Sequence, residues 1–243
     1  SYRDSSGQQQ TGGFSYDVSR KNNTVKGWYS EASIQSVIFN ISRITENKGL
    51  QTLGDIIRVI SAQDYIGHPG YVSIHLFADR LRKGFPEYTM SLDDLLIEQD
   101  VAVTDEYGFG EANTGGIQDV IPLYKSLLLN GIPERACVTN DFGSYNKLGN
   151  AQYFKFDISV AGTYQFSAIE NGSDSGDADP ELYIYSAGEI IEVGESSQID
   201  EEKFSVFLNP GIYILELNDN RINDINVMSA LRACFDVRVQ LIN

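Results

Sequence analysis

The sequence predicts an α+β protein of two domains, with a helical unit over residues 1–136 and an antiparallel β-sandwich or jelly roll over residues 137–243. Three observations support this prediction. Apolar residues recur at helical spacing in the first half, the period changes to two from about residue 153, and 243 residues suit two domains of ordinary size. With 42% hydrophobic residues, the chain holds enough apolar side chains for two cores.

Four helices are expected after a polar, irregular segment over residues 1–27. Ser30 suits an N-cap for the first, which should end before Gly49. The others are expected over about residues 50–62, near 71–83 and from Ser91 through Leu96, where Ser91 resembles the start of a capping box. The apolar stripe of the first helix comprises Ile34, Val37, Ile38, Ile41 and Ile44, and that of the second Leu53, Ile56, Ile57 and Ile60.

Seven short strands are expected in the second half, where apolar and polar residues alternate. They lie near residues 153–158, 164–168, 182–184, 190–193, 204–208, 213–217 and 235–241. Asn209, Pro210 and Gly211 form a strong turn signal between two of them. Strands of this length and spacing are typical of an antiparallel sandwich.

The charge of the chain excludes two classes of partner. The formal net charge is −16, and residues 137–243 carry six basic side chains against 17 acidic ones. Such a surface repels phosphate backbones and anionic membranes, so we expect no nucleic-acid binding. No apolar run approaches the roughly 20 residues of a membrane span.

The two cysteines, Cys137 and Cys234, bracket the acidic half of the chain. A disulfide between them would close a loop of about 100 residues and stabilise the fold by up to about 4–5 kcal/mol. Disulfides persist in oxidising compartments, which predicts a secreted, extracellular or periplasmic protein. Cys234 alternates with Phe235, so its sulfur is expected off the core face. The alternative is two buried free thiols.

An acidic loop precedes the strand near residues 182–184. Its carboxylates Asp174, Asp177 and Asp179 are spaced at i, i+3 and i+5, and they supply the hard oxygen ligands that Ca²⁺ prefers. We therefore name these three residues as candidate calcium ligands. The spacing is not that of an EF-hand, and the alternative is a solvated turn at the edge of the sheet.

The chain offers no complete active site, so we assign no catalytic residue. It contains two histidines, His68 and His75, and lacks the His-Glu-X-X-His segment of a zinc peptidase. No Gly-X-Ser-X-Gly nucleophile elbow occurs either. The loop over residues 105–116 holds three carboxylates and four glycines, which favours a turn packed on its neighbours over a second cation site.

Several segments carry a resemblance to a known family. Residues 27–37 (GWYSEASIQSV) resemble a helix found late in the peptidase region of secreted bacterial zinc-metallopeptidase-like proteins. Residues 2–7, 105–113 and 142–150 are similar to further segments of that family, in the same order. The acidic half resembles the bacterial pre-peptidase C-terminal domain at residues 179–183 (DPELY) and 234–237 (CFDV).

This resemblance implies that the zinc-binding helix lies upstream of Ser1, so Zn²⁺ is expected only in that missing part. The chain begins without Met, a basic segment or an apolar segment, and we expect a fragment or a processed product. The implied function is a non-catalytic C-terminal portion of a peptidase-like protein, with an accessory sandwich for secretion, maturation or substrate attachment. Its expected partners are the upstream peptidase region of the same precursor and a protein or polysaccharide substrate.

The alternative is a free-standing extracellular module that binds carbohydrate or protein through tyrosine side chains. Aromatic rings with a polar edge suit such surfaces. The candidate residues are Tyr153, Tyr183, Tyr185 and Tyr213.

Overall fold

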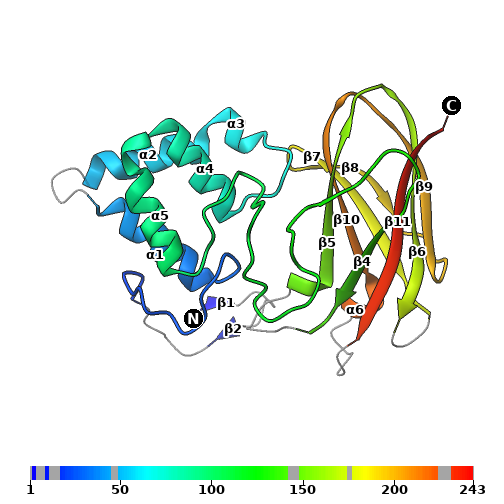
Figure 1. Cartoon of the computed structure of the whole chain (residues 1–243), viewed down its shortest axis with the longest axis horizontal. Helices are drawn as coiled ribbons and strands as arrows, with labels where there is room; N and C mark the ends of the chain where they lie inside the picture. The colour runs from blue at the N-terminus through cyan, green and yellow to red at the C-terminus, as the bar shows by residue number, and fades with distance from the viewer. Residues whose placement is uncertain are drawn as a thin grey trace.

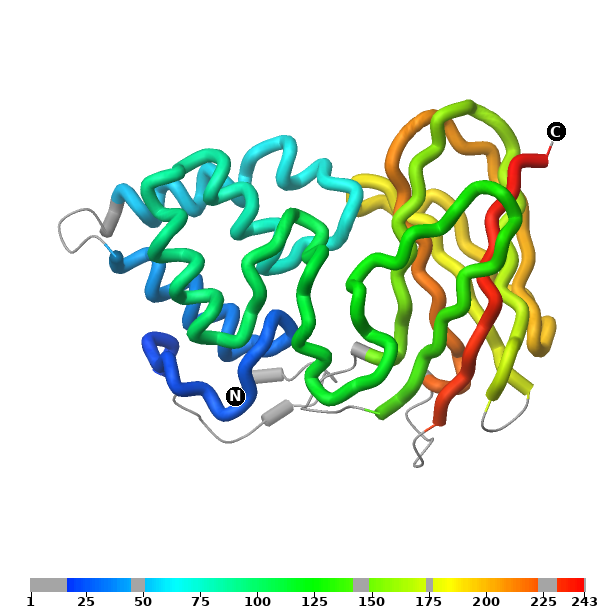
Figure 2. Tube along the Cα trace, viewed as in Figure 1, coloured from blue at the N-terminus to red at the C-terminus, as the bar shows by residue number. Residues whose placement is uncertain are grey.

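The computed structural model describes residues 2–3, 9–10, 17–44, 49–141, 148–173, 177–223 and 231–242. Helices gather at one end of an elongated molecule and strands at the other, and the segment over residues 100–133 runs between them (Figures 1 and 2). Two separate clusters of buried apolar residues form the cores, one among the helices and one between the sheets.

The helical end is built from short helices joined by short loops. They are α1 (Glu31–Ser42), α2 (Gly49–Ser61), α3 (Gln63–Ile66), α4 (Ile74–Gly84), the 3-10 turn η1 (Pro86–Tyr88) and α5 (Thr89–Glu98). The predicted N-cap of α1 is present, since the Ser30 hydroxyl accepts a hydrogen bond from the Ser33 amide. Ser73 caps α4 in the same way through the Leu76 amide.

Two predicted helix starts are wrong. The third expected helix begins at Ile74, because Ser73 supplies the cap, and Val72 stays outside it with 71% of its surface exposed. The last begins at Thr89 directly after η1, so Ser91 lies inside α5 and caps nothing. The third helix thus begins later than expected and the last begins earlier.

The second helix buries only one residue of its predicted apolar stripe, Ile56, which belongs to the helical core. Leu53, Ile57 and Ile60 are 47%, 52% and 44% exposed. The polar side chains of Thr52 and Asp55 are buried instead, where the Tyr88 hydroxyl donates a hydrogen bond of 2.9 Å to the Asp55 carboxylate. An apolar stripe of α2 therefore faces outward.

The strands form two sheets that face each other. One has the order β3-β5-β10-β7-β8 and the other β4-β11-β6-β9. Their bounds are β3 (Lys125–Ser126), β4 (Glu134–Thr139), β5 (Ala151–Ile158), β6 (Gly162–Ser173), β7 (Pro180–Ser186), β8 (Glu189–Gly194), β9 (Glu201–Leu208), β10 (Gly211–Asp219) and β11 (Arg232–Ile242). Pairing is antiparallel except between β3 and β5. The remaining elements are a ladder of β1 (Tyr2–Arg3) with β2 (Gln9–Gln10), the 3-10 turn η2 (Leu148–Asn150) and a short helix, α6 (Asn220–Asn223).

The seven predicted strands correspond to β5–β11, and in all of them except β8 the alternation places one set of side chains in or against the sandwich core. Fully buried members include Phe154, Phe166, Leu182, Ile184 and Phe235. Strands β3 and β4 were not predicted, because β3 has two residues and β4 mixes charged with apolar ones. The α+β class with a β-sandwich is confirmed, while the division of the chain at residue 137 stays a prediction.

Cys137 and Cys234 form a disulfide that joins β4 to β11. The two residues lie directly opposite each other in the strand register. Both are buried, yet neither belongs to the cluster of the sandwich core, in agreement with the alternation around Phe235. None of the described helices is long and apolar enough to cross a membrane.

Candidate functional site

The helical end meets the outer face of the five-stranded sheet through tyrosine rings. Tyr71, in the loop before α4, contacts Tyr153 of β5 and Tyr185 of β7, with ring centroids 4.8 Å and 5.3 Å apart. Its hydroxyl donates a hydrogen bond of 2.7 Å to the Glu216 carboxylate of β10. Burial and this neighbouring carboxylate raise the pKa of Tyr71 far above its usual value, so the phenol keeps its proton.

The segment over residues 100–133, between the helices and the sandwich, is held at the same place by tyrosine contacts. The Tyr124 hydroxyl accepts a hydrogen bond of 2.9 Å from the Tyr71 amide. The Tyr107 ring packs against Tyr124, and the Lys155 ammonium lies 4.7 Å from the centre of the Tyr107 ring. Burial raises the pKa of Tyr124 to about 12. The five-stranded sheet, the segment over residues 100–133 and the loop before α4 therefore meet in one cluster of aromatic side chains.

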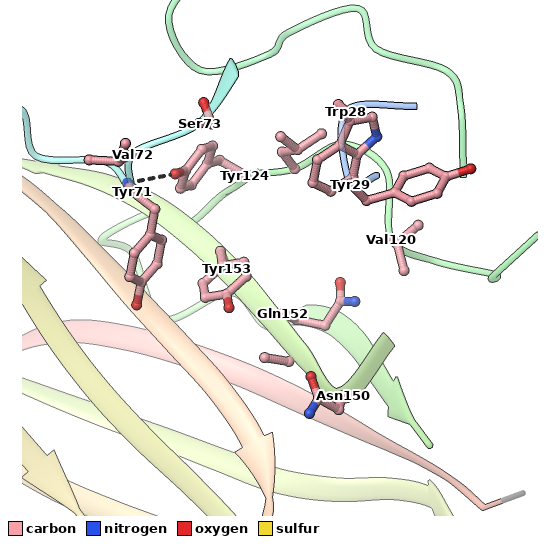
Figure 3. Close-up of a pocket in the computed structure, with 12 residues that line it drawn as sticks. Trp28, Tyr29, Tyr71, Val72, Ser73, Val120, Tyr124, Asn150, Gln152 and Tyr153 are labelled. Carbon is pink, nitrogen blue, oxygen red and sulfur yellow. Dashed lines mark hydrogen bonds between the residues drawn. The ribbon is translucent and has the colours of Figure 1, made fainter. Parts of the chain in front are cut away.

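A pocket of about 320 Å³ opens beside these tyrosines (Figure 3). Trp28 and Tyr29 form one wall, and Tyr71 and Tyr124 contribute from the other side. Asn150 and the first three residues of β5, 151–153, complete the lining beside Val72, Ser73, Val120 and Leu123. Its volume is at the lower end of the range for small-molecule pockets. We call it the junction pocket.

Hydrogen bonds to Asn113 hold the aromatic wall in place. The Trp28 indole donates one of 2.9 Å to the Asn113 carbonyl, and the Tyr29 hydroxyl donates one of 3.2 Å to the Asn113 side chain. Gly115 lies at φ +61° against the Tyr29 ring, where an added Cβ would approach it to 2.8 Å. Gly115 thus lets the 105–116 loop pack closely against Tyr29 in the pocket wall.

Gln152 is the one polar side chain of the junction pocket that is both buried and without a hydrogen bond to any described residue. Only 4% of its surface is exposed. Figure 3 shows its amide group turned away from β5 toward Tyr29 and Val120. Its amide atoms are not among the buried side-chain atoms that lack a partner, so they are accessible from the pocket and can bond to a ligand there.

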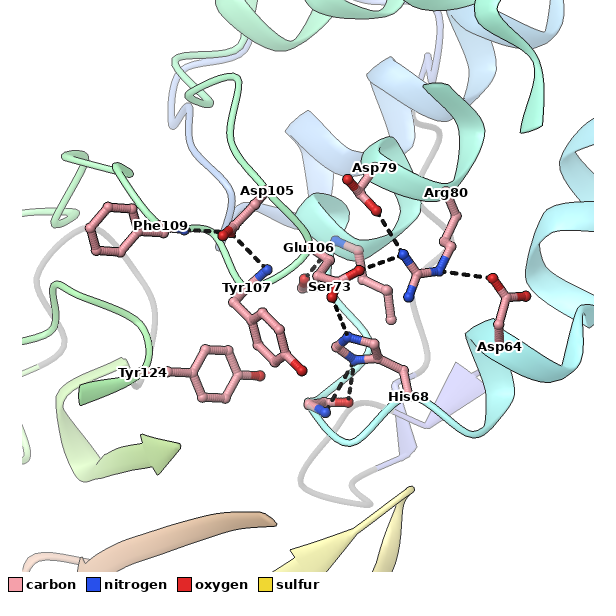
Figure 4. A network of polar contacts seen from close by, with 12 residues as sticks. Asp64, His68, Ser73, Asp79, Arg80, Asp105, Glu106, Tyr107, Phe109 and Tyr124 are labelled. Atoms are coloured by element: carbon pink, nitrogen blue, oxygen red, sulfur yellow. Dashed lines mark hydrogen bonds and ion pairs between the residues drawn. The ribbon is translucent and has the colours of Figure 1, made fainter. Parts of the chain in front are cut away.

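The carboxylates of the 105–116 loop have partners in the protein. Glu106 pairs with Arg80 of α4, which also contacts Asp64 at 3.1 Å and Asp79 at 2.7 Å (Figure 4). Salt bridges to Arg80 lower the pKa of Glu106 against the opposing effect of burial. Asp105 accepts the backbone amides that follow it in the loop. This supports the interpretation of the loop as a packed turn.

The two histidines are buried and contact different partners. His75 Nδ1 is 2.9 Å from the Thr104 hydroxyl, and its Nε2 is 3.6 Å from the Glu111 carboxylate. His68 Nδ1 accepts the Gly70 amide at 3.1 Å, and its Nε2 is 3.8 Å from Glu106. Burial lowers the pKa of both imidazoles. Within the described residues, no group of three or more His, Cys, Asp or Glu side chains is placed to hold a metal.

The candidate calcium loop is described only in part, because Asp174 lies outside the described residues. Asp177 has φ +55°, and its carbonyl accepts a hydrogen bond from Arg221. The Asp179 carboxylate accepts one of 3.1 Å from Asn220, and the Asp179 amide donates to Asp219. The calcium site therefore stays a prediction, and Asp219 is a buried neighbour that the sequence pattern did not indicate.

The four tyrosines considered for ligand binding have different surroundings. Tyr213 belongs to the sandwich core and stacks on Phe156, so that assignment is wrong. Tyr153 and Tyr185 contact Tyr71 at the junction. Tyr183 lies half-buried on the outer face of β7, where its hydroxyl bonds to glutamate side chains. Of the four, Tyr153 alone lines the junction pocket.

No family model and no curated protein matches the chain. Among solved structures, the pre-peptidase C-terminal domain of a collagenase from Bacillus anthracis aligns with 47% of this chain and 96% of that domain, at 10% identity and a TM-score of 0.32. PliG, a periplasmic inhibitor of g-type lysozyme from Aeromonas hydrophila, aligns over 48% and 97%, at 9% identity and a TM-score of 0.28. A β-glucosidase from Paenibacillus barengoltzii aligns over 46% and 11%, at 14% identity and a TM-score of 0.22. Scores this low carry no argument about function.

Proposed function

We propose that this chain is the non-catalytic C-terminal part of a secreted bacterial metallopeptidase-like protein. Its sandwich serves secretion, maturation or substrate attachment, and the peptidase region with its zinc lies upstream in the same precursor. The order of the sequence segments supports this assignment. The disulfide between Cys137 and Cys234 is consistent with an oxidising compartment.

The observation that carries the proposal is the outward apolar stripe of α2. Leu53, Ile57 and Ile60 recur at helical spacing and are each close to half exposed, while Thr52 and Asp55 of the same helix are buried. An exposed apolar stripe of this kind suits a protein contact. We propose that the upstream region of the precursor covers this stripe of α2.

Substrate attachment is the role that the junction pocket supports. It offers aromatic walls and an amide group without a partner among the described residues. The same pocket also suits a free-standing binding protein, which is the second candidate. The gene sequence upstream of Ser1 separates the two, because a His-Glu-X-X-His segment favours the first and a signal peptide directly before Ser1 favours the second.

A peptidase assay tests the non-catalytic role. The purified chain is incubated with an unstructured protein substrate, with and without added zinc, and we expect no cleavage in either case. Cleavage that a chelator abolishes would contradict the proposal.

A second experiment tests the contact at α2 in the full-length precursor. Ile57→Ser is expected to change the stability of the isolated chain by no more than about 0.5 kcal/mol, because the side chain is exposed. In the precursor the same substitution should lower the unfolding temperature by several degrees. Ile199→Ser, a 56% exposed position in the sandwich, is the matched control. Equal effects of the two substitutions in the precursor would count against the contact.

A further inference from the structure

Strand β5 has an open edge at the junction pocket. On one side it pairs with β10 from Ala151 to Ile158, but on the other it pairs with β3 only at Phe154 and Lys155. Among the described strands, none pairs with residues 151–153 on that second side. These same residues line the junction pocket.

The backbone groups of β5 face this open edge at alternate residues. The Leu127 amide donates a hydrogen bond of 3.1 Å to the Lys155 carbonyl, so the backbone of Lys155 points toward the β3 side. Because direction alternates along a strand, Ala151 and Tyr153 direct backbone groups to the same side. The pocket thus presents a short stretch of strand edge for pairing.

The side chains that line the junction pocket limit the class of ligand that it can bind. The described residues that line the junction pocket include no Asp, Glu, Lys, Arg or His, in a chain of net charge −16. A charged group would lose its hydration there without gaining a partner. The rings of Trp28, Tyr29 and Tyr124 instead suit an apolar side chain.

We propose that the junction pocket binds an extended, uncharged peptide segment. The segment adds as a short strand beside residues 151–153 and places an apolar side chain in the space lined by Trp28 and Tyr153. The amide of Gln152 donates to and accepts from the polar groups of this segment. This inference rests on the attachment role proposed above and names its ligand class.

The open strand edge favours a peptide over a sugar. A neutral sugar ring would also stack on the aromatic walls and bond to Gln152, but it offers no continuous row of backbone partners for Ala151 and Tyr153. A peptide satisfies the strand edge and the side-chain amide together. A volume of about 320 Å³ accommodates one or two side chains, so a short segment suffices.

Trp28 provides the readout, since it is the only tryptophan of the chain and lies in the pocket wall. The probes are acetylated, amidated heptapeptides that alternate threonine with one apolar residue, namely valine, leucine, isoleucine, phenylalanine or methionine. Each has a twin in which alternate backbone amides are N-methylated and cannot donate hydrogen bonds. Cellohexaose and chitohexaose are the neutral sugar probes. Trp28 emission is followed during titration of each probe.

We expect saturable changes in Trp28 emission with at least one of the heptapeptides and a tenfold or weaker affinity for its N-methylated twin. Gln152→Ala should weaken binding of that heptapeptide about tenfold without changing the unfolding temperature by more than a few degrees. Gln198→Ala, at an exposed position in the β8–β9 loop, should change the affinity less than twofold.

The remaining outcomes separate the two proposals. Binding of a sugar probe without binding of any heptapeptide overturns the peptide inference and leaves the attachment role in place. Equal affinity for a heptapeptide and its N-methylated twin overturns strand addition. No change in Trp28 emission with any probe overturns the inference and removes the pocket as support for the attachment role, while the contact at α2 is tested separately.

Discussion

Tyr71 and Glu216, 145 residues apart in the chain, are joined by a hydrogen bond of 2.7 Å that connects the loop before α4 to the centre of the five-stranded sheet. Hydrogen bonds to a charged group stabilise more than neutral ones. The bond therefore links the two ends of the molecule at the place where the junction pocket forms.

Tyr71→Phe should lower the free energy of unfolding by about 2 kcal/mol, because it leaves the Glu216 carboxylate half-buried without this donor. Urea unfolding measures the change. Tyr183→Phe is the control, since it also removes a hydroxyl bonded to glutamate but at a more exposed position, and should cost less than about 1 kcal/mol. Equal costs would show that the Tyr71 hydroxyl has no special role.

Stability should fall as the pH falls below about 6.5. Burial lowers the pKa of His68 and His75 in the folded chain below the ordinary value of 6.5, so the unfolded chain takes up protons first. The stability from the neutral imidazoles is fully present above this value and is lost as pH drops toward the folded pKa. Each histidine contributes up to about 1.4 kcal/mol per pH unit.

Urea unfolding at pH 7.5 and pH 5.5 measures this dependence. His75→Gln should reduce the difference between the two pH values, because its amide does not titrate in this range and still reaches Thr104. An unchanged difference would assign the acid sensitivity to other groups.

The disulfide should contribute about 4–5 kcal/mol to stability, because Cys137 and Cys234 are separated by 97 positions in the chain. Replacing both with serine should lower the denaturant midpoint accordingly. Mass spectrometry of the native protein should find it two hydrogen atoms lighter than the reduced form. Two alkylatable thiols in the native protein would contradict the assignment.

Calcium should raise the melting temperature if Asp174, Asp177 and Asp179 bind it. At a hundredfold excess over the dissociation constant the gain is about 2.7 kcal/mol, or several degrees. Thermal unfolding in EGTA and in millimolar Ca²⁺ measures it, with Asp177→Asn and Asp179→Asn expected to abolish the shift. Asp157→Asn, an exposed carboxylate of β5 outside the loop, should retain it. No shift in the parent chain would leave the loop as a solvated turn.

The strands of the sandwich could be predicted because most of them bury one face, so that apolar residues recur at every second position. Strand β8 is the exception, since Ile190 and Ile191 are 57% and 41% exposed. The cap at Ser30 could be predicted because its chemistry is local. The burial of Ile56 on α2 follows from its apolar stripe, but the burial of Asp55 could not be predicted, because its hydrogen-bond donor Tyr88 lies 33 residues away. The junction pocket has no sequence signal, because Trp28, Tyr71, Tyr124 and Gln152 come from four separate segments.

The disulfide has a further consequence for cleavage of the backbone. All strands from β5 to β10 lie between Cys137 and Cys234. A single backbone cut anywhere in that interval leaves both pieces covalently attached and releases no fragment. Surface loops such as the one between β8 and β9 can thus be cut without loss of the C-terminal strand. The two pieces separate only after the disulfide is reduced.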